Sequence, residues 1–317
     1  MVVTTMSAIA PFITALATEP NKVPHIGWLG SYSETLPAYQ GFRDGLRELG
    51  YIPGENVIVD ARWAEGKLER LPSLASELAS LNVNVMLVGG EDGLKAAKAA
   101  SATIPIVVVT CDPMDRLVAS IARPGGKATG FTCISSELTN KRLQILKEFV
   151  PQLNRVAVLY RAADIGKSSE FGDLNQAAAK LDVTVKAYVA GTNAEIGNAF
   201  TDMDKNRTQG LVILADSFMN SRLKTLADLA LGNHLPTIYG FREFTDAGGL
   251  MSYGANRREE LKQAASYIDK ILKGADPGGL PIQLPTTFEF VVNLRTAKAL
   301  NLTVPQSAFI LANEVIE

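Results

Sequence analysis

The residues best suited to chemistry in this chain lie where predicted strands end, and they are polar or aromatic. Residues 241–254 place two Phe, an Arg, a Glu and an Asp directly before a Gly-Gly turn and a short strand. This stretch supplies no nucleophile beside a base, so it is suited to holding a ligand rather than transforming one. The chain also lacks a P-loop, a nucleophile elbow and a His-Glu-x-x-His motif. We therefore expect a binding protein without catalytic residues.

Metal and cofactor sites are not indicated by the sequence either. The two histidines, His25 and His234, have no cysteine or carboxylate nearby at the spacing of metal ligands. The glycine-rich residues 89–93 do not follow the dinucleotide-binding fingerprint. Their acidic pair would also repel a phosphate at a helix N-terminus. We expect neither a metal nor a cofactor.

The elements that must position the polar residues alternate between strand and helix. Short apolar runs predict buried strands, and the 3–4-residue spacing of apolar residues between them predicts helices. Strands are expected at 26–29, 57–59, 83–88, 104–109, 128–133, 155–160, 183–189, 210–214, 237–239 and 288–292, and a long amphipathic helix at 257–272. Buried runs of this kind indicate parallel sheets covered on both faces, joined by right-handed crossovers. The pattern predicts two doubly wound α/β units.

The loops at the carboxyl ends of the strands form the predicted binding site, because ligands bind at that edge of an open α/β sheet. Their hydroxyls, carboxylates, backbone N–H groups and rings suit a small zwitterion with an apolar or aromatic side chain. The candidate ligand-binding residues are Ser31, Tyr32, Gly90, Glu91, Asp112, Tyr160, Arg161, Asp216, Tyr239 and Tyr253.

Several candidates have structural interpretations that the sequence leaves open. Asp112 and Asp216 are also suited to capping helices, a role that does not exclude contact with a ligand. Glu91 would favour the dipole of its own helix. Arg161 is also compatible with an ordinary surface charge, and the tyrosines with half-buried packing.

The composition describes a globular chain without an electrostatic footprint for nucleic acid. The 317 residues are 47% hydrophobic and 20% charged, with a formal net charge of −2. A nucleic-acid-binding protein would show a basic patch and a high pI. The two cysteines, Cys111 and Cys133, allow at most one bridge, and we expect two free thiols in or near strands.

The N-terminus is similar to an export signal. Residues 7–17 are small and apolar, and Ala15-Leu16-Ala17 matches a small-residue cleavage site. No Lys or Arg precedes this stretch, which a start codon assigned too far downstream would explain. We expect a signal-like segment at 1–22 and a periplasmic mature protein.

Four runs of this sequence, 41–51, 122–130, 241–254 and 288–304, resemble the solute-binding component of bacterial ABC importers. The subfamily they resemble includes proteins that bind tryptophan and other aromatic amino acids. The resemblance implies a type I periplasmic binding fold, whose two lobes are joined by three crossings near Phe131, Tyr253 and Phe288. Lobe 1 would comprise 23–131 with 255–286, and lobe 2 would comprise 132–254 with 287–317.

The resemblance also implies a function and its partners. It describes a monomeric receptor that closes on a small amino-acid-like or aromatic solute and docks on a membrane permease. Glu91 and Asp92 depart from the small hydroxyl residues common in the family, which favours an ammonium over a carboxylate at that loop. A ligand-sensing regulator of the same fold is the alternative. An α/β enzyme is disfavoured because no catalytic constellation is present.

Overall fold

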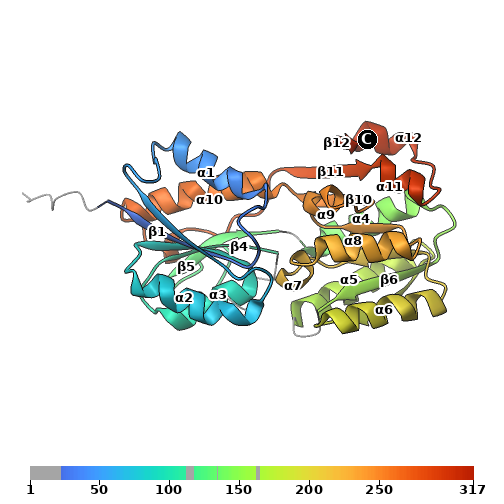
Figure 1. Ribbon diagram of the computed structural model, residues 1–317, viewed down its shortest axis with the longest axis horizontal. Coiled ribbons are helices and arrows are strands. Elements are labelled where there is room, and N and C mark those ends of the chain that lie inside the picture. The colour runs from blue at the N-terminus through green and yellow to red at the C-terminus, as the bar shows by residue number, and fades with distance from the viewer. Residues whose placement is uncertain (1–22, 112–117, 134, 162–164) are drawn as a thin grey trace, which may run out of the picture.

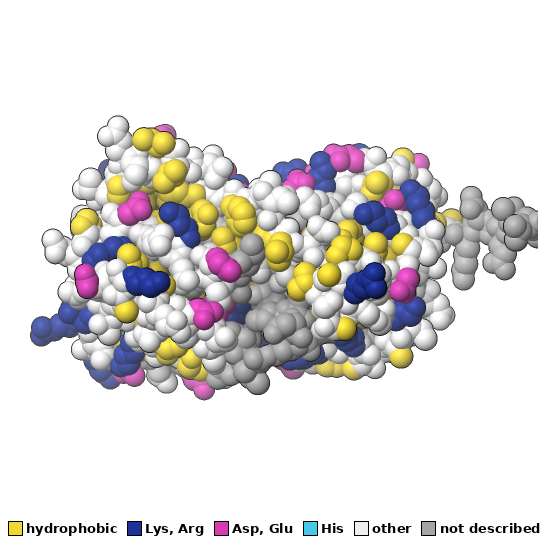
Figure 2. Space-filling model, turned by 180° about the vertical axis from the view of Figure 1, so that it is seen from behind, with side chains coloured by type: hydrophobic (Ala, Val, Ile, Leu, Met, Phe, Trp, Pro, Cys, Tyr) yellow, Lys and Arg dark blue, Asp and Glu magenta, His cyan; other side chains and the backbone are white. Residues whose placement is uncertain are grey.

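Two twisted sheets, each covered by helices on both faces, form two lobes that lie side by side (Figure 1). The structure is a computed structural model that describes residues 23–111, 118–133, 135–161 and 165–317. The signal-like segment 1–22 lies outside the described residues. On its rear face the molecule is notched at its upper edge between the lobes, and basic, acidic and hydrophobic side chains are intermixed over both lobes (Figure 2). Two doubly wound α/β lobes, as expected from the alternation of elements, are confirmed.

The first lobe contains five strands in the order β2-β1-β3-β4-β5, and all its pairs are parallel. The strands are β1 (His25–Gly30), β2 (Ile58–Trp63), β3 (Val85–Gly89), β4 (Ile106–Thr110) and β5 (Ala128–Thr132). Helices α1 (Tyr39–Glu48) and α10 (Arg257–Leu272) cover one face, and α2 (Leu71–Ser80) and α3 (Gly90–Ala100) cover the other. Short 3-10 turns lie at Leu68–Arg70 and Pro277–Gly279.

Two features hold α1 and α10 on this sheet. The ring of Trp28 in β1 meets Tyr39, Phe42 and Trp63 edge-on, with centroids 4.8–5.1 Å apart. Glycine in α1 lets the two helices approach closely. A Cβ at Gly45 would lie 2.5 Å from the carbonyl oxygen of Lys262. The long helix therefore packs in the first lobe, although in the chain it directly follows a strand of the second lobe.

The second lobe contains seven strands in the order β12-β11-β10-β9-β8-β6-β7. The strands are β6 (Arg155–Tyr160), β7 (Thr184–Val189), β8 (Gly210–Ile213), β9 (Thr237–Tyr239), β10 (Met251–Ala255), β11 (Phe288–Asn293) and β12 (Glu314–Ile316). Helices α4 (Ser135–Phe149) and α5 (Ile165–Ala179) pack on one face, and α6 (Asn193–Lys205) and α8 (Leu223–Gly232) on the other. The shorter helices are α7 (Ser217–Asn220), α9 (Arg242–Asp246), α11 (Leu294–Ala299) and α12 (Gln306–Leu311).

The chain crosses between the two sheets three times: between β5 and α4, between β10 and α10, and before β11. This confirms the expected three-crossing plan. The crossings lie beside Phe131, Tyr253 and Phe288, the positions predicted for the hinges. The residue boundaries given for the two lobes stay a prediction.

Two features of the local structure differ from the sequence analysis, and three short elements are additional. Residues 242–246, where no helix was expected, form helix α9. The β10–β11 pair is antiparallel. Strand β10 leaves the second sheet toward the first lobe and β11 returns from it, so the two strands run in opposite directions. Helices α7 and α12 and strand β12 were not predicted, because each is short and has too few residues to show a period.

The expectation of two free thiols is also wrong, because Cys111 and Cys133 form a disulfide. Strands β4 and β5 are parallel neighbours with Thr110 opposite Thr132. Cys111 and Cys133 directly follow these two threonines and are therefore adjacent, with their Cα atoms 4.8 Å apart. The bridge fastens the end of β4 to the start of the first crossing.

Candidate ligand-binding site

A narrow cavity lies between the lobes, at the carboxyl ends of strands from both sheets. Its volume is about 40 Å³. This volume is well below the range of about 300–1,000 Å³ that is usual for small-molecule sites. The lining residues are Tyr32, Gly89, Gly90, Val109, Thr110, Cys111, Arg257 and Glu260 from the first lobe, and Ala215, Asp216, Ser217, Asn220 and Phe241 from the second.

Three of the predicted site residues line this cavity: Tyr32, Gly90 and Asp216. Asp216 also caps α7, since its Oδ1 accepts a hydrogen bond of 2.8 Å from the backbone N–H of Met219. Gly90 opens α3 with a φ of +74°, a conformation that favours glycine. Ser31 supports this wall, since its hydroxyl donates a hydrogen bond of 3.2 Å to the carbonyl oxygen of Gly89.

The other predicted tyrosines lie in the core of the second lobe, outside the set of residues that lines the cavity. Tyr239 is fully buried, and its hydroxyl donates to Asn220 Oδ1. Tyr160 stacks on Phe171, with ring centroids 6.0 Å apart. Tyr253 is half-buried at the second crossing. Tyr239 thereby contacts Asn220, a cavity-lining residue, and the ligand roles of these three tyrosines stay predictions.

The predicted charged residues are engaged with other side chains. Arg161 Nη1 donates to Asp92 Oδ2 at 2.6 Å, an ion pair that joins the second lobe to α3 of the first. Glu91 pairs with Lys95 inside α3. Asp112 lies outside the described residues.

Other contacts also hold the lobes against one another. Lys167 Nζ, on α5 of the second lobe, donates to the carbonyl oxygen of Cys111 at 3.2 Å. A Cβ at Gly90 would lie 2.1 Å from Ser217 Oγ on the opposite lobe. With the pair between Arg161 and Asp92, these contacts show that the lobes are closed over the cavity.

The sequence analysis missed the two charged residues at the start of α10 that line the cavity, Arg257 and Glu260. Helix α10 buries Leu261, Ala264 and Ile268, and Glu260 is buried with them. A charge in line with an apolar stripe was the available signal, because buried charges need a partner or a function. Burial raises the pKa of Glu260 to about 7, although nearby Arg257 opposes that shift.

Arg257 sits between two aromatic rings and a carboxylate. Its guanidinium carbon lies 4.6 Å from the ring centroid of Phe241 and 5.4 Å from that of Tyr32. Its Nη1 lies 3.6 Å from Glu243 Oε1. Burial alone would lower the pKa of Arg257, but the neighbouring carboxylates, Glu243 foremost, raise it above its usual range. Arg257 is therefore a permanent cation in the wall of the cavity.

The comparisons with known proteins agree with this architecture. The family described as ABC transporter substrate binding protein matches residues 32–316. The chain belongs to this family. It is 24% identical over 289 residues to a tyrosine-binding protein of Clostridioides difficile, covering 90% of this chain and 83% of the relative.

Two solved structures of substrate-binding proteins are similar to this one. A domain from Streptococcus pneumoniae in complex with L-Trp has a TM-score of 0.85 at 22% identity, covering 93% of this chain and 100% of that one. A ligand-free, open substrate binding protein from Clostridium difficile has a TM-score of 0.66 at 23% identity, covering 93% and 99%. Both likenesses show the same two-lobed fold.

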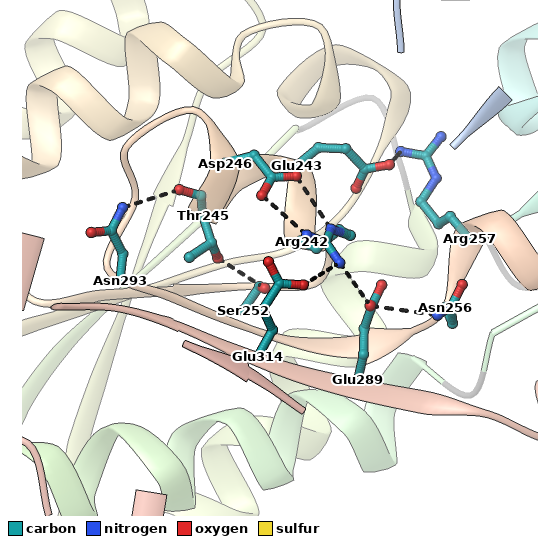
Figure 3. A network of polar contacts seen from close by, with 10 residues as sticks. All are labelled: Arg242, Glu243, Thr245, Asp246, Ser252, Asn256, Arg257, Glu289, Asn293 and Glu314. Atoms are coloured by element: carbon teal, nitrogen blue, oxygen red, sulfur yellow. Dashed lines mark hydrogen bonds and ion pairs between the residues drawn. The ribbon is translucent and has the colours of Figure 1, made fainter. Parts of the chain in front are cut away.

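Behind the cavity of this substrate-binding protein, a polar network ties α9 to the last strands (Figure 3). Arg242 contacts Asp246, Glu289 and Glu314 at 3.3, 3.6 and 2.9 Å. Burial raises the pKa of Glu289 to about 7, while Arg242 lowers it in part. The network fixes α9, and with it Glu243, which follows Arg242 directly and faces Arg257.

The described residues contain no group of three or more His, Cys, Asp or Glu side chains arranged to hold a metal ion. Nor does any described helix combine the length and apolar character needed to cross a bilayer.

Proposed function

We propose that this substrate-binding protein captures a small amino-acid-like solute with an aromatic or apolar side chain and delivers it to a membrane ABC permease, without transforming it. The observation that carries the proposal is the inter-lobe cavity. Its wall combines a buried cation, two carboxylates and two aromatic rings in one narrow space. Such a wall complements a zwitterion with a ring or an apolar chain. The tyrosine-binding relative and the tryptophan complex support the same class of solute.

The proposed mechanism is closure of the lobes about the three crossings. At nearly equal identity, the TM-score is 0.85 with the tryptophan complex and 0.66 with the open structure, which supports a closed arrangement here. Opening would break the ion pair between Arg161 and Asp92 and separate Tyr32 from Asp216. Closure on a solute completes the contacts from the second lobe, as in other hinged receptors.

We place the mature protein in the periplasm, as a monomer that meets the permease through its closed form. The disulfide between Cys111 and Cys133 supports this location, because such bridges persist in oxidising compartments. Cleavage near Ala17 would release the mature chain. Intact residues 1–17 on periplasmic protein would contradict this cleavage, and an exclusively cytosolic protein would contradict export.

The solute can be identified by native mass spectrometry of the protein as purified, since receptors of this kind can retain their ligand. Calorimetry with that solute then tests the cavity. We expect Asp216→Ala to weaken binding by more than about 1.5 kcal/mol, because a charged partner is lost. The control is Asp228→Asn, which removes an exposed carboxylate paired with Lys224 on α8 and should leave affinity unchanged. Equal affinities of wild type and Asp216→Ala would reject this cavity as the binding site.

A further inference from the structure

We propose, building on the function proposed above, that Arg257 binds the anionic head of the solute while Asp216 and Glu260 face its ammonium group. The cavity would then select a complete zwitterion over an amine or a carboxylate with the same side chain. Arg257 is a specificity-determining residue in this proposal, and Glu243 is a positioning residue that orients it.

The first support is the way in which Arg257 is held. Its side chain is 12% exposed, and Phe241 and Tyr32 contact it from opposite lobes. Rings over a guanidinium attract its charge and restrict its plane without using its N–H donors. The N–H donors of Arg257 are therefore not used by the two rings. Since one ring comes from each lobe, this geometry exists only when the lobes are closed.

The second support is the loose pairing of Arg257 with Glu243. The Nη1–Oε1 distance is 3.6 Å, whereas charge-assisted hydrogen bonds between such groups measure about 2.7–2.9 Å. Among the described residues, neither oxygen of Glu243 has a hydrogen-bond donor, and Arg257 Nη1 has no acceptor. Glu243 is only 6% exposed, so both groups have been taken out of water at a substantial cost. A pair that served structure alone would close this distance and form two parallel bonds.

The third support is the charge distribution around the cavity. Two carboxylates, Asp216 and Glu260, line it together with the single guanidinium of Arg257. A solute with only a carboxylate would satisfy Arg257 but would offer no donor to the carboxyl oxygens of Asp216 and Glu260. A solute with only an ammonium would leave Arg257 without an acceptor, which is costly for a buried donor. A zwitterion satisfies both sets of groups at once.

The experiment compares three probes of equal ring size by calorimetry: L-tryptophan, tryptamine and indole-3-propionate. In wild type we expect L-tryptophan to bind at least tenfold more tightly than either analogue. In Arg257→Gln, L-tryptophan should bind less than threefold more tightly than tryptamine. Its preference over indole-3-propionate should stay at least tenfold. Arg257→Lys should restore part of the preference for L-tryptophan over tryptamine. The matched control is Arg258→Gln, since Arg258 is the next residue, is 63% exposed and pairs with Asp44; this variant should behave as wild type.

The outcomes separate the two proposals. If tryptamine binds wild type as tightly as L-tryptophan does, or if the tenfold gap survives in Arg257→Gln, the role of Arg257 is rejected and the receptor function stands. If wild type binds neither L-tryptophan nor L-tyrosine, the amino-acid-like solute is itself rejected, and this inference with it. Should Arg257→Gln fail to fold by circular dichroism, Glu243→Gln provides the second variant. This variant keeps the cation of Arg257 but removes the carboxylate that positions it. An unchanged preference for L-tryptophan over tryptamine in this variant would reject the positioning role of Glu243.

Discussion

The ion pair between Arg161 and Asp92 gives a quantitative prediction about closure. It is a contact between lobes, with Nη1 and Oδ2 2.6 Å apart and side chains that are 24% and 30% exposed. Hydrogen bonds to charged groups contribute about 1.5–3 kcal/mol when buried, and exposed pairs contribute about 0.2–1 kcal/mol. At this intermediate exposure we expect about 1 kcal/mol. Breaking the pair should therefore weaken solute binding about fivefold, because RT is about 0.6 kcal/mol.

The assay is a double-mutant cycle on the dissociation constant, measured by calorimetry for wild type, Arg161→Gln, Asp92→Asn and the double variant. We expect the double variant to bind no worse than either single variant, with a coupling energy of about 1 kcal/mol. The free energy of unfolding without solute should not change when the lobes are open, since an open form does not contain this contact. Single effects that add within about 0.3 kcal/mol would refute the pair as a closing contact. A loss confined to Arg161→Gln would instead support the predicted contact of Arg161 with the solute.

Three further predictions concern stability. Cys133→Ala should lower the free energy of unfolding by about 3 kcal/mol in urea, given the 22-residue separation that the bridge closes, and an unchanged midpoint would contradict this. Burial raises the pKa of Glu260 to about 7, above that of a glutamate in the unfolded chain. Between about pH 4.3 and pH 7 the folded state therefore binds this proton more tightly than the unfolded state does, and the free energy of unfolding should fall as the pH rises. Glu260→Gln should remove part of that fall in urea titrations between pH 4 and 8, and an identical slope would reject the shift. Gly45→Ala should destabilise by about 1–3 kcal/mol, because its Cβ would lie 2.5 Å from the Lys262 carbonyl oxygen. Gly197→Ala, in α6 with no described atom within 4 Å, should stabilise by about 0.5–1 kcal/mol, and equal effects of the two would overturn the contact between α1 and α10.

Apolar runs and helical periodicity in the sequence were sufficient to predict most of the regular elements of both lobes. The run at 155–160 and the amphipathic helix at 257–272 were predicted with the bounds that β6 and α10 have in the structure. The first is a continuous apolar run that is buried in the sheet, and the second is long enough to show a helical period. Asp216 was also predicted both as a helix cap and as a residue of the cleft, since the two roles need the same position after a strand.

The parts that could not be predicted depend on contacts between distant segments. Arg257 enters the cavity only because α10 packs in the first lobe while its N-terminus faces Phe241 of the second. Pairing of Cys111 with Cys133 depends on β4 and β5 being neighbours, which local patterns do not reveal. Tyr239 was selected as a ligand-binding candidate because it ends a strand; the structure places its ring in the core of the second lobe, and its ligand role stays a prediction. The position of a residue at the end of a strand does not determine which way its side chain points.

The most direct measurement is a crystal structure of the protein with the solute that native mass spectrometry identifies. We predict electron density for that solute in the inter-lobe cavity, with its anionic head within hydrogen-bonding distance of Arg257 and its ammonium facing Asp216. A solute bound outside the space between Tyr32 and Asp216, or a cavity that stays empty in crystals soaked at a saturating concentration, would contradict the proposed capture between the lobes.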